Sequence, residues 1–164
     1  MAAAVIGAPM VKLIGAYMQL AVPAVLYHGT CSQVADAILA EGLLYQKGSQ
    51  QSMASRGGNY LATSLAMAAS FAKSRAFRTG GTPVVFAVQA HRLSADALSF
   101  DLNMCGRYWS EALVYQDALP PNLLTLVEKD IKALPGARML LNEPTPGVDQ
   151  VALDLTWEKA KLFC

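Results

Sequence analysis

The chain has 164 residues, of which 54% are hydrophobic and 15% are charged, so it is long and apolar enough to bury a core and is not a disordered tail. Its formal net charge of +1 provides no general attraction to nucleic acid or to an anionic membrane. The three cysteines are far apart and form no C-x-x-C or Cys/His pair, which argues against a structural zinc site and against a disulfide framework.

The first 26 residues are apolar but are interrupted by Lys12, Gln19 and Pro23. A membrane-spanning helix needs about 20 consecutive apolar residues, so these two polar residues argue against a span. No basic segment precedes Met10, as a secretory signal would require. We expect a helix over residues 1–23 that packs on the core, with a membrane-interacting segment as the alternative.

The next segment predicts a strand, a turn and a helix. Residues 24–27 form a short apolar run that is typical of a buried strand. His28 is expected to follow this strand, at the start of a turn that contains Gly29 and Thr30. Ser32 is then a candidate N-cap for a helix whose apolar residues recur at helical spacing. Gly42 is expected to end that helix.

The middle of the chain alternates turn signals with short apolar runs. Residues 46–58 are polar and glycine-rich, which indicates a loop. Ser64 is the expected cap of a second helix. Further strands are predicted over residues 59–63, 84–88, 98–102, 112–115 and 123–127. The continuous β-branched and aromatic run at 84–88 predicts a strand that is covered on both faces.

Residues 129–164 contain several turn signals and an amphipathic segment at 151–163. No repeat or low-complexity linker is present. Short strands mixed with helices predict one domain of the α+β class over residues 1–164.

Three polar residues each lie at, or just after, a short apolar run: His28, Tyr60 and Glu111. An uncompensated carboxylate at the start of an apolar strand is costly, which marks Glu111 as a candidate functional acid. Asp117, in a predicted turn, is the alternative acid. Together, the three residues are suited to holding a small polar ligand and stabilising a developing positive charge.

Two further groups have alternative interpretations. Cys31 lies beside His28 in the sequence and is a candidate nucleophile, with a structural thiol as the favoured interpretation. Four basic residues are interpreted as a solvated rim, with a local basic stripe as the alternative: Arg75, Arg78, His91 and Arg92.

Three segments, taken in order, resemble the motifs of the diphtheria-toxin and PARP type of ADP-ribosyltransferase. The first is Leu-Tyr-His-Gly-Thr at 26–30, followed by Ala-Glu-Gly-Leu at 40–43. The second is Gly-Asn-Tyr-Leu-Ala at 58–62, followed by Ala-Ser-Phe at 69–71. The third is Ser-Glu-Ala-Leu-Val-Tyr at 110–115. The resemblance covers residues 24–128 and leaves 1–23 and 129–164 outside it.

The resemblance implies a split β-sheet with flanking helices and a cleft for NAD between two small sheets. It implies that His28 hydrogen-bonds the adenosine-side ribose, with Thr30 nearby. The Gly29 backbone would hold the nicotinamide carboxamide, and Tyr60 and Phe71 would lie against the two faces of the nicotinamide ring.

Glu111 completes the His-Tyr-Glu triad, and the resemblance implies that it hydrogen-bonds the nicotinamide ribose and polarises the transfer. Two positions depart from the family pattern. Ala68 replaces a hydroxyl residue three positions before the second aromatic, and Leu44 stands where an arginine is common. Lys47 and Arg56 are candidate contacts to the pyrophosphate of NAD.

The implied activity is transfer of one ADP-ribose unit from NAD to a macromolecular acceptor, either protein or nucleic acid, without a metal. A small transferase with no accessory module resembles a toxin or effector that acts in the cytoplasm, with an immunity protein or antitoxin as a possible partner. Two alternatives remain open, an NAD glycohydrolase and a catalytically inactive binding module of the same fold.

Overall fold

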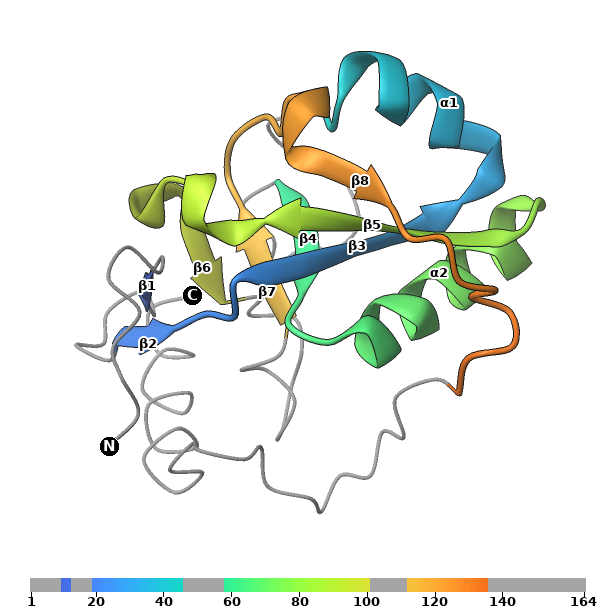
Figure 1. Cartoon of the computed structure of the whole chain (residues 1–164), viewed down its shortest axis with the longest axis horizontal. Helices are drawn as coiled ribbons and strands as arrows, with labels where there is room; N and C mark the ends of the chain where they lie inside the picture. Colours follow the sequence, from blue (N-terminus) through green and yellow to red (C-terminus); the bar gives the residue numbers. More distant parts are fainter. Residues whose placement is uncertain (1–9, 13–18, 46–57, 101–111, 136–164) are drawn as a thin grey trace.

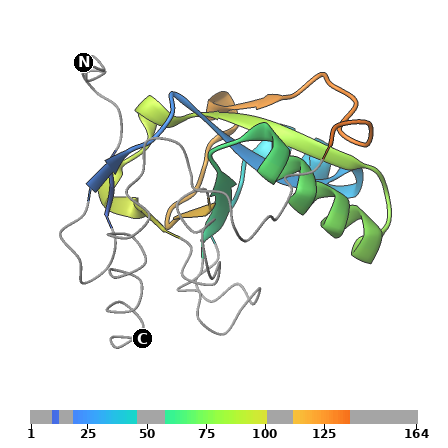
Figure 2. The same cartoon turned by 90° about the horizontal axis from the view of Figure 1, so that it is seen from below.

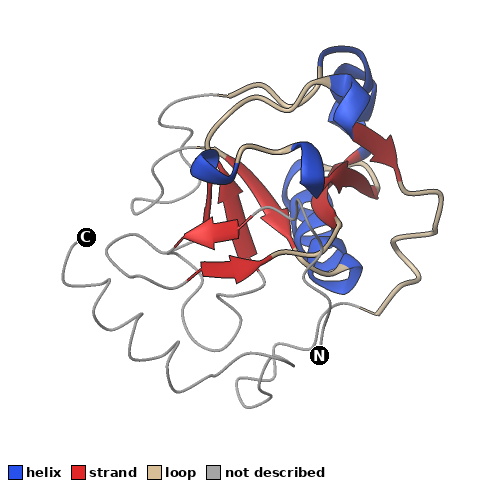
Figure 3. Cartoon of the chain, turned by 60° about the vertical axis from the view of Figure 1, so that its left-hand side comes forward, coloured by secondary structure: helices blue, strands red, loops and turns tan. Residues whose placement is uncertain are grey.

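The computed structural model describes residues 10–12, 19–45, 58–100 and 112–135. In these residues short strands are mixed with two α-helices, which confirms the predicted α+β class (Figure 3). The helices are α1 (Ser32–Glu41) and α2 (Leu65–Thr79). The strands are β1 (Met10–Lys12), β2 (Gln19–Ala21), β3 (Val25–Cys31), β4 (Asn59–Ala62), β5 (Pro83–Gln89), β6 (Leu98–Phe100), β7 (Ala112–Tyr115) and β8 (Leu124–Leu126).

The described strands form one sheet in the order β2-β1-β6-β7-β4-β3-β5-β8, with every neighbouring pair antiparallel except β1 and β6. The ladder between β3 and β5 extends over all of β3, and that between β4 and β7 over all of β4. In contrast, β3 and β4 are joined by the single pair Tyr27↔Ala62. Figure 1 shows β4 and β7 running steeply across the direction of β3 and β5. The sheet therefore consists of two halves, a β4 half and a β3 half, that meet at one pair.

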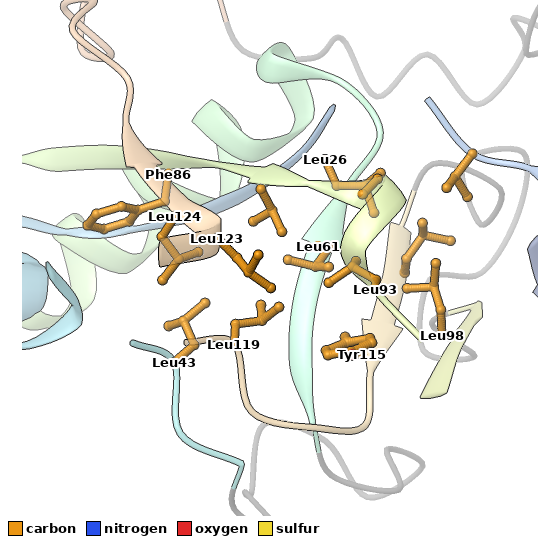
Figure 4. Packing of buried hydrophobic residues seen from close by; sticks show 14 of the residues in the cluster. Leu26, Leu43, Leu61, Phe86, Leu93, Leu98, Tyr115, Leu119, Leu123 and Leu124 are labelled. Carbon is orange, nitrogen blue, oxygen red and sulfur yellow. The ribbon is translucent and has the colours of Figure 1, made fainter. Parts of the chain in front are cut away.

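The larger hydrophobic cluster fills the face of the sheet toward α1, and Figure 4 shows its packing. Strand residues reach it at every second position, as the pleat requires. On β5, Phe86 and Val88 point into this cluster, whereas Val85 points to the opposite face, and all three are at most 1% exposed. Val84 is half-buried. Burial on both sides confirms the prediction made from the continuous apolar run in this strand.

The second cluster lies between the sheet and α2, and Figure 2, which views the molecule from below, shows α2 against β3 and β5. The helix presents Ala68, Ala69 and Ala72, whose small side chains allow close approach to the sheet. A Cβ built on Gly29 would lie only 2.1 Å from the carbonyl oxygen of Ala68. Glycine at this position is therefore required by the helix that packs on the strand.

The helix ends follow the predicted signals with one shift. The Ser64 hydroxyl accepts a hydrogen bond from the Met67 N–H at 3.1 Å, which confirms it as the cap of α2. Gly42 ends α1 with a positive φ of 80°, also as predicted. However, the N-cap of α1 is Cys31 and not Ser32, whose hydroxyl instead accepts a hydrogen bond from the Thr82 N–H.

The predicted helix over residues 1–23 is wrong where the structure describes it. Residues 10–12 and 19–21 are strands that pair with each other, and β1 also pairs with β6. The apolar composition is compatible with either state, and the pairing with a strand almost 90 residues later decides between them. Neither α-helix of the described chain is long and apolar enough to span a membrane.

Smaller differences concern strand ends. The predicted strand 24–27 extends to Cys31, so His28, Gly29 and Thr30 belong to β3 and not to a turn. Strands β4, β6 and β8 are shorter than the predicted 59–63, 98–102 and 123–127, with residues 101–102 outside the described chain. The predicted loop over 46–57 and the segment 151–163 are also outside it.

Candidate functional site

The candidate site lies where the β3 half and the β4 half of the sheet separate. His28 on β3 and Tyr60 on β4 were predicted from separate motifs, and the structure joins them. The Nδ1 nitrogen of His28 lies 2.8 Å from the backbone carbonyl oxygen of Tyr60, 32 residues further along the chain. Two of the three motifs therefore meet at the junction of the sheet.

This hydrogen bond defines the tautomer of the neutral His28 ring. A carbonyl oxygen can only accept, so Nδ1–H donates and the second ring nitrogen, Nε2, is unprotonated in the neutral ring. Burial lowers the pKa of His28 below its usual 6.5; the hydrogen bond to Tyr60 opposes this shift, and the positive charge of Arg75 adds to it. At neutral pH His28 is therefore an uncharged ring that can accept a hydrogen bond through Nε2.

The backbone of Gly29 offers a second pair of polar groups. The Val127 N–H donates to the Val85 carbonyl at 2.9 Å, so the backbone groups of Val85 point toward β8. Because hydrogen-bonding direction alternates along an antiparallel pair, the backbone N–H and C=O of Gly29, opposite Val85, point away from β5 and toward β4. The registered pairing with β4 has already ended at Tyr27. One residue thus presents a donor and an acceptor side by side at the separation of the strands.

The two aromatic residues of the second motif are both half-buried. Tyr60 lies on β4, and its hydroxyl is buried without a hydrogen-bond partner in the part of the chain that the structure describes. A buried hydroxyl without a partner is costly, which makes it a group that a ligand can satisfy. Phe71 lies on α2 and packs against the second hydrophobic cluster. Its ring therefore has a core role whether or not it also contacts a ligand.

Thr30 and Cys31 are enclosed. Thr30 is 6% exposed and Cys31 is 1% exposed. The Thr79 hydroxyl, 3.4 Å from the Cys31 sulfur, lowers the pKa of the thiol; burial opposes this effect, and backbone N–H groups at the start of α1 reinforce it. Because the sulfur is inaccessible in the folded chain, the structure favours the structural interpretation of Cys31 over the nucleophile.

The two candidate acids differ in what the structure describes. Glu111 lies outside the described residues, so the third motif is represented only by β7, which begins at Ala112 and pairs there with Ala62. Asp117 is exposed, and its carboxylate accepts a hydrogen bond from the next backbone N–H at 2.7 Å. This local bond is typical of the turn that the sequence predicts for Asp117.

Arg75 is the residue whose environment the sequence interpretation missed. Arg78, His91 and Arg92 are exposed, as expected of a solvated rim. Arg75, however, is half-buried, and its Nε is buried without a hydrogen-bond partner in the described chain. Its position four residues after Phe71 was the available signal, because residues at that spacing share one face of a helix. Lys47 and Arg56 lie outside the described residues.

Within the described residues, no group of three or more His, Cys, Asp or Glu side chains is arranged to hold a metal ion. No protein-family model matches the chain, and no curated protein sequence matches it. The assignment of a function therefore depends on the chemistry of the residues at the junction.

Proposed function

We propose that the chain is an NAD-dependent mono-ADP-ribosyltransferase of the diphtheria-toxin and PARP type, with an ADP-ribosyltransferase-like split sheet. The observation that carries this proposal is the meeting of His28 and Tyr60 at the single-pair junction between the two halves of the sheet. The resemblance requires a cleft at such a split, flanked by the strands that carry the histidine and the tyrosine. Strands β3 and β4, which carry these residues, meet at a single registered pair.

The groups at the junction match polar parts of NAD. A primary carboxamide has one acceptor and two donors, and the outward-facing N–H and C=O of Gly29 complement them. A ribose hydroxyl can donate to the unprotonated Nε2 of His28. The ring of Tyr60 offers a flat surface on which nicotinamide can stack.

Glu111 is the proposed catalytic residue. The bond between C1′ of the ribose and the nicotinamide nitrogen breaks, and its electron pair leaves with nicotinamide. The ribose then carries positive charge that the bound ground state lacks, and a carboxylate beside it stabilises the transition state preferentially. The acceptor forms its new bond at C1′ and loses a proton as it attacks. We propose a toxin or effector role in the cytoplasm, with a protein or nucleic-acid acceptor and an immunity protein or antitoxin as partner.

The test is a comparison of Glu111→Gln with Asp117→Asn. Each substitution removes one negative charge and keeps the shape of the side chain. For Glu111→Gln we expect NAD affinity, measured by titration calorimetry, to stay within the wild-type range, while nicotinamide release falls by about 100-fold or more. Asp117→Asn should retain turnover. Full turnover in Glu111→Gln, or its loss in a folded Asp117→Asn variant, would contradict the assignment.

A labelling experiment separates the alternative functions. Labelled NAD is incubated with the wild-type protein and a cell lysate, and the products are digested separately with protease and with nuclease. Label that protease releases identifies a protein acceptor, and label that nuclease releases identifies a nucleic acid. Nicotinamide release without any label on macromolecules would indicate a glycohydrolase. NAD binding without turnover would indicate a binding module.

A further inference from the structure

The guanidinium of Arg75 is an unexplained polar group in the described chain. The residue is half-buried on α2, and its Nε is buried with no hydrogen-bond partner in the described residues. The two other cationic side chains of α2 are engaged: Lys73 Nζ donates to the carbonyl of Leu134, and Arg78 Nε approaches the carbonyl of Ser74 at 3.4 Å. A buried donor on a cation is costly to leave unpaired, so Arg75 requires a partner that the described residues do not supply.

Two contacts place Arg75 along β3. The backbone of Ala72 lies against Gly29, where an added Cβ would be 2.9 Å from the Ala72 nitrogen. Further along α2, the Thr79 hydroxyl lies 3.4 Å from the Cys31 sulfur. Arg75 is between Ala72 and Thr79 on the helix, and so it is opposite the end of β3 that extends past its last pair with β4.

The helical repeat indicates the side of α2 on which Arg75 lies. Residues two apart on a helix are rotated by about 200°, so Lys73 and Arg75 project from opposite flanks. Lys73 reaches Leu134, in the segment that follows β8, which places its flank on the β8 side. Arg75 is therefore on the β4 side, next to the separation of β3 and β4. Its charge also lowers the pKa of His28 on that strand.

The other groups at this position cannot neutralise an anion. His28 is neutral and presents an acceptor, and Gly29 presents one backbone donor. NAD, however, carries a negatively charged pyrophosphate between its two ribose units, and such a group needs a cation when it leaves water. The planar guanidinium is suited to this group because it can donate two parallel hydrogen bonds to phosphate oxygens.

We infer that Arg75 binds the pyrophosphate of NAD and so determines the preference of the site for a dinucleotide over a nucleoside. This inference rests on the proposed function, because it takes NAD as the ligand. It assigns the pyrophosphate contact to a residue of α2, whereas the sequence analysis named Lys47 and Arg56 as candidates for this contact.

The first test uses Arg75→Gln and Arg75→Lys, with Arg78→Gln as the matched control on the same helix. Titration calorimetry measures the affinity for NAD and for nicotinamide riboside, which lacks both phosphates. We expect Arg75→Gln to weaken NAD binding by about 10- to 100-fold and to leave nicotinamide riboside binding unchanged. Arg75→Lys should recover part of the NAD affinity, and Arg78→Gln should match the wild type. Equal NAD affinity in Arg75→Gln and Arg78→Gln, or equal losses for both ligands, would overturn the inference.

A second measurement keeps this inference distinct from the proposed function. In the wild-type protein the Nε–Hε resonance of Arg75 is followed by nitrogen–proton correlation spectra during titration with NAD, and separately with inorganic pyrophosphate. A shift with pyrophosphate supports the anion site even if NAD fails to bind, in which case only the proposed function fails. NAD binding that leaves this resonance unmoved overturns the role of Arg75 and leaves the proposed function standing.

Discussion

Substitution of Gly29 by alanine tests the packing that holds the candidate site in place. The added Cβ would lie 2.1 Å from the carbonyl oxygen of Ala68 and 2.9 Å from the backbone nitrogen of Ala72, whereas ordinary contacts begin at 3.4 Å. Both obstacles are backbone atoms of α2, so no side-chain rotation relieves the clash. Strand and helix must separate by roughly 1 Å to restore an ordinary contact.

The size of the effect follows from the interface that this separation disrupts. Ala68, Ala72 and Val85 are each 0% exposed, so the gap cannot be filled by rearranging exposed groups. A gap of roughly 0.5–1 Å removes a quarter to a half of the dispersion attraction between facing atoms. Overpacking in cores costs about 1–3 kcal/mol. Because the obstacles are rigid, we expect the free energy of unfolding to fall by about 3 kcal/mol.

Urea denaturation followed by circular dichroism measures this difference, with Val25→Ala as the control. Val25 is on the same strand but is 38% exposed, so its truncation should cost less than about 1 kcal/mol. For a chain of this length, a loss of about 3 kcal/mol also corresponds to a fall of roughly 6–12 °C in Tm. If Gly29→Ala and Val25→Ala have the same midpoint as the wild type, α2 does not pack against Gly29 as described.

Two further predictions concern the ligand contacts at the junction. Tyr60→Ala should weaken NAD binding by about 1–3 kcal/mol through loss of stacking, whereas Tyr60→Phe should be mild; calorimetry with equal affinities in all three proteins would contradict the stacking role. Because the folded pKa of His28 is below 6.5, the free energy of unfolding should hold above pH 6.5 and fall as pH drops below it, since the unfolded chain takes up the proton first. NAD affinity should fall only at the lower pH at which the folded ring itself becomes protonated. His28→Gln should remove this pH dependence, and affinity that already declines above pH 7 would argue against the neutral ring.

Signals that act within a few residues were predictable from the sequence. Ser64 and Gly42 mark helix ends because a cap depends on the backbone groups of one turn. The buried strand β5 was predictable because a continuous apolar run satisfies both faces of a sheet. The ordered motifs predicted that His28 and Tyr60 serve one ligand, but no local pattern specifies the 2.8 Å hydrogen bond between them.

Features that depend on distant partners were not predictable in the same way. His28 lies within a strand and not in a turn because it pairs with Phe86, 58 positions later. From the sequence alone, Gly29 is interpreted as a turn residue or a ligand contact. Only the packing of α2 against it shows why this position requires glycine. Likewise, the sequence places Arg75 among four surface basic residues, whereas the structure shows that its Nε is buried without a hydrogen-bond partner in the described residues.

The ring of His28 has a structural role and a proposed role in ligand binding. Through Nδ1 it joins the β3 half of the sheet to the β4 half beside their single registered pair, and in the proposed function its other nitrogen accepts a hydrogen bond from the ligand. Under the proposed function, folding stability and activity therefore depend on the same side chain. A substitution of His28 would then change both properties together, whereas the proposed function predicts that a substitution of Glu111 removes activity and leaves this hydrogen bond in place.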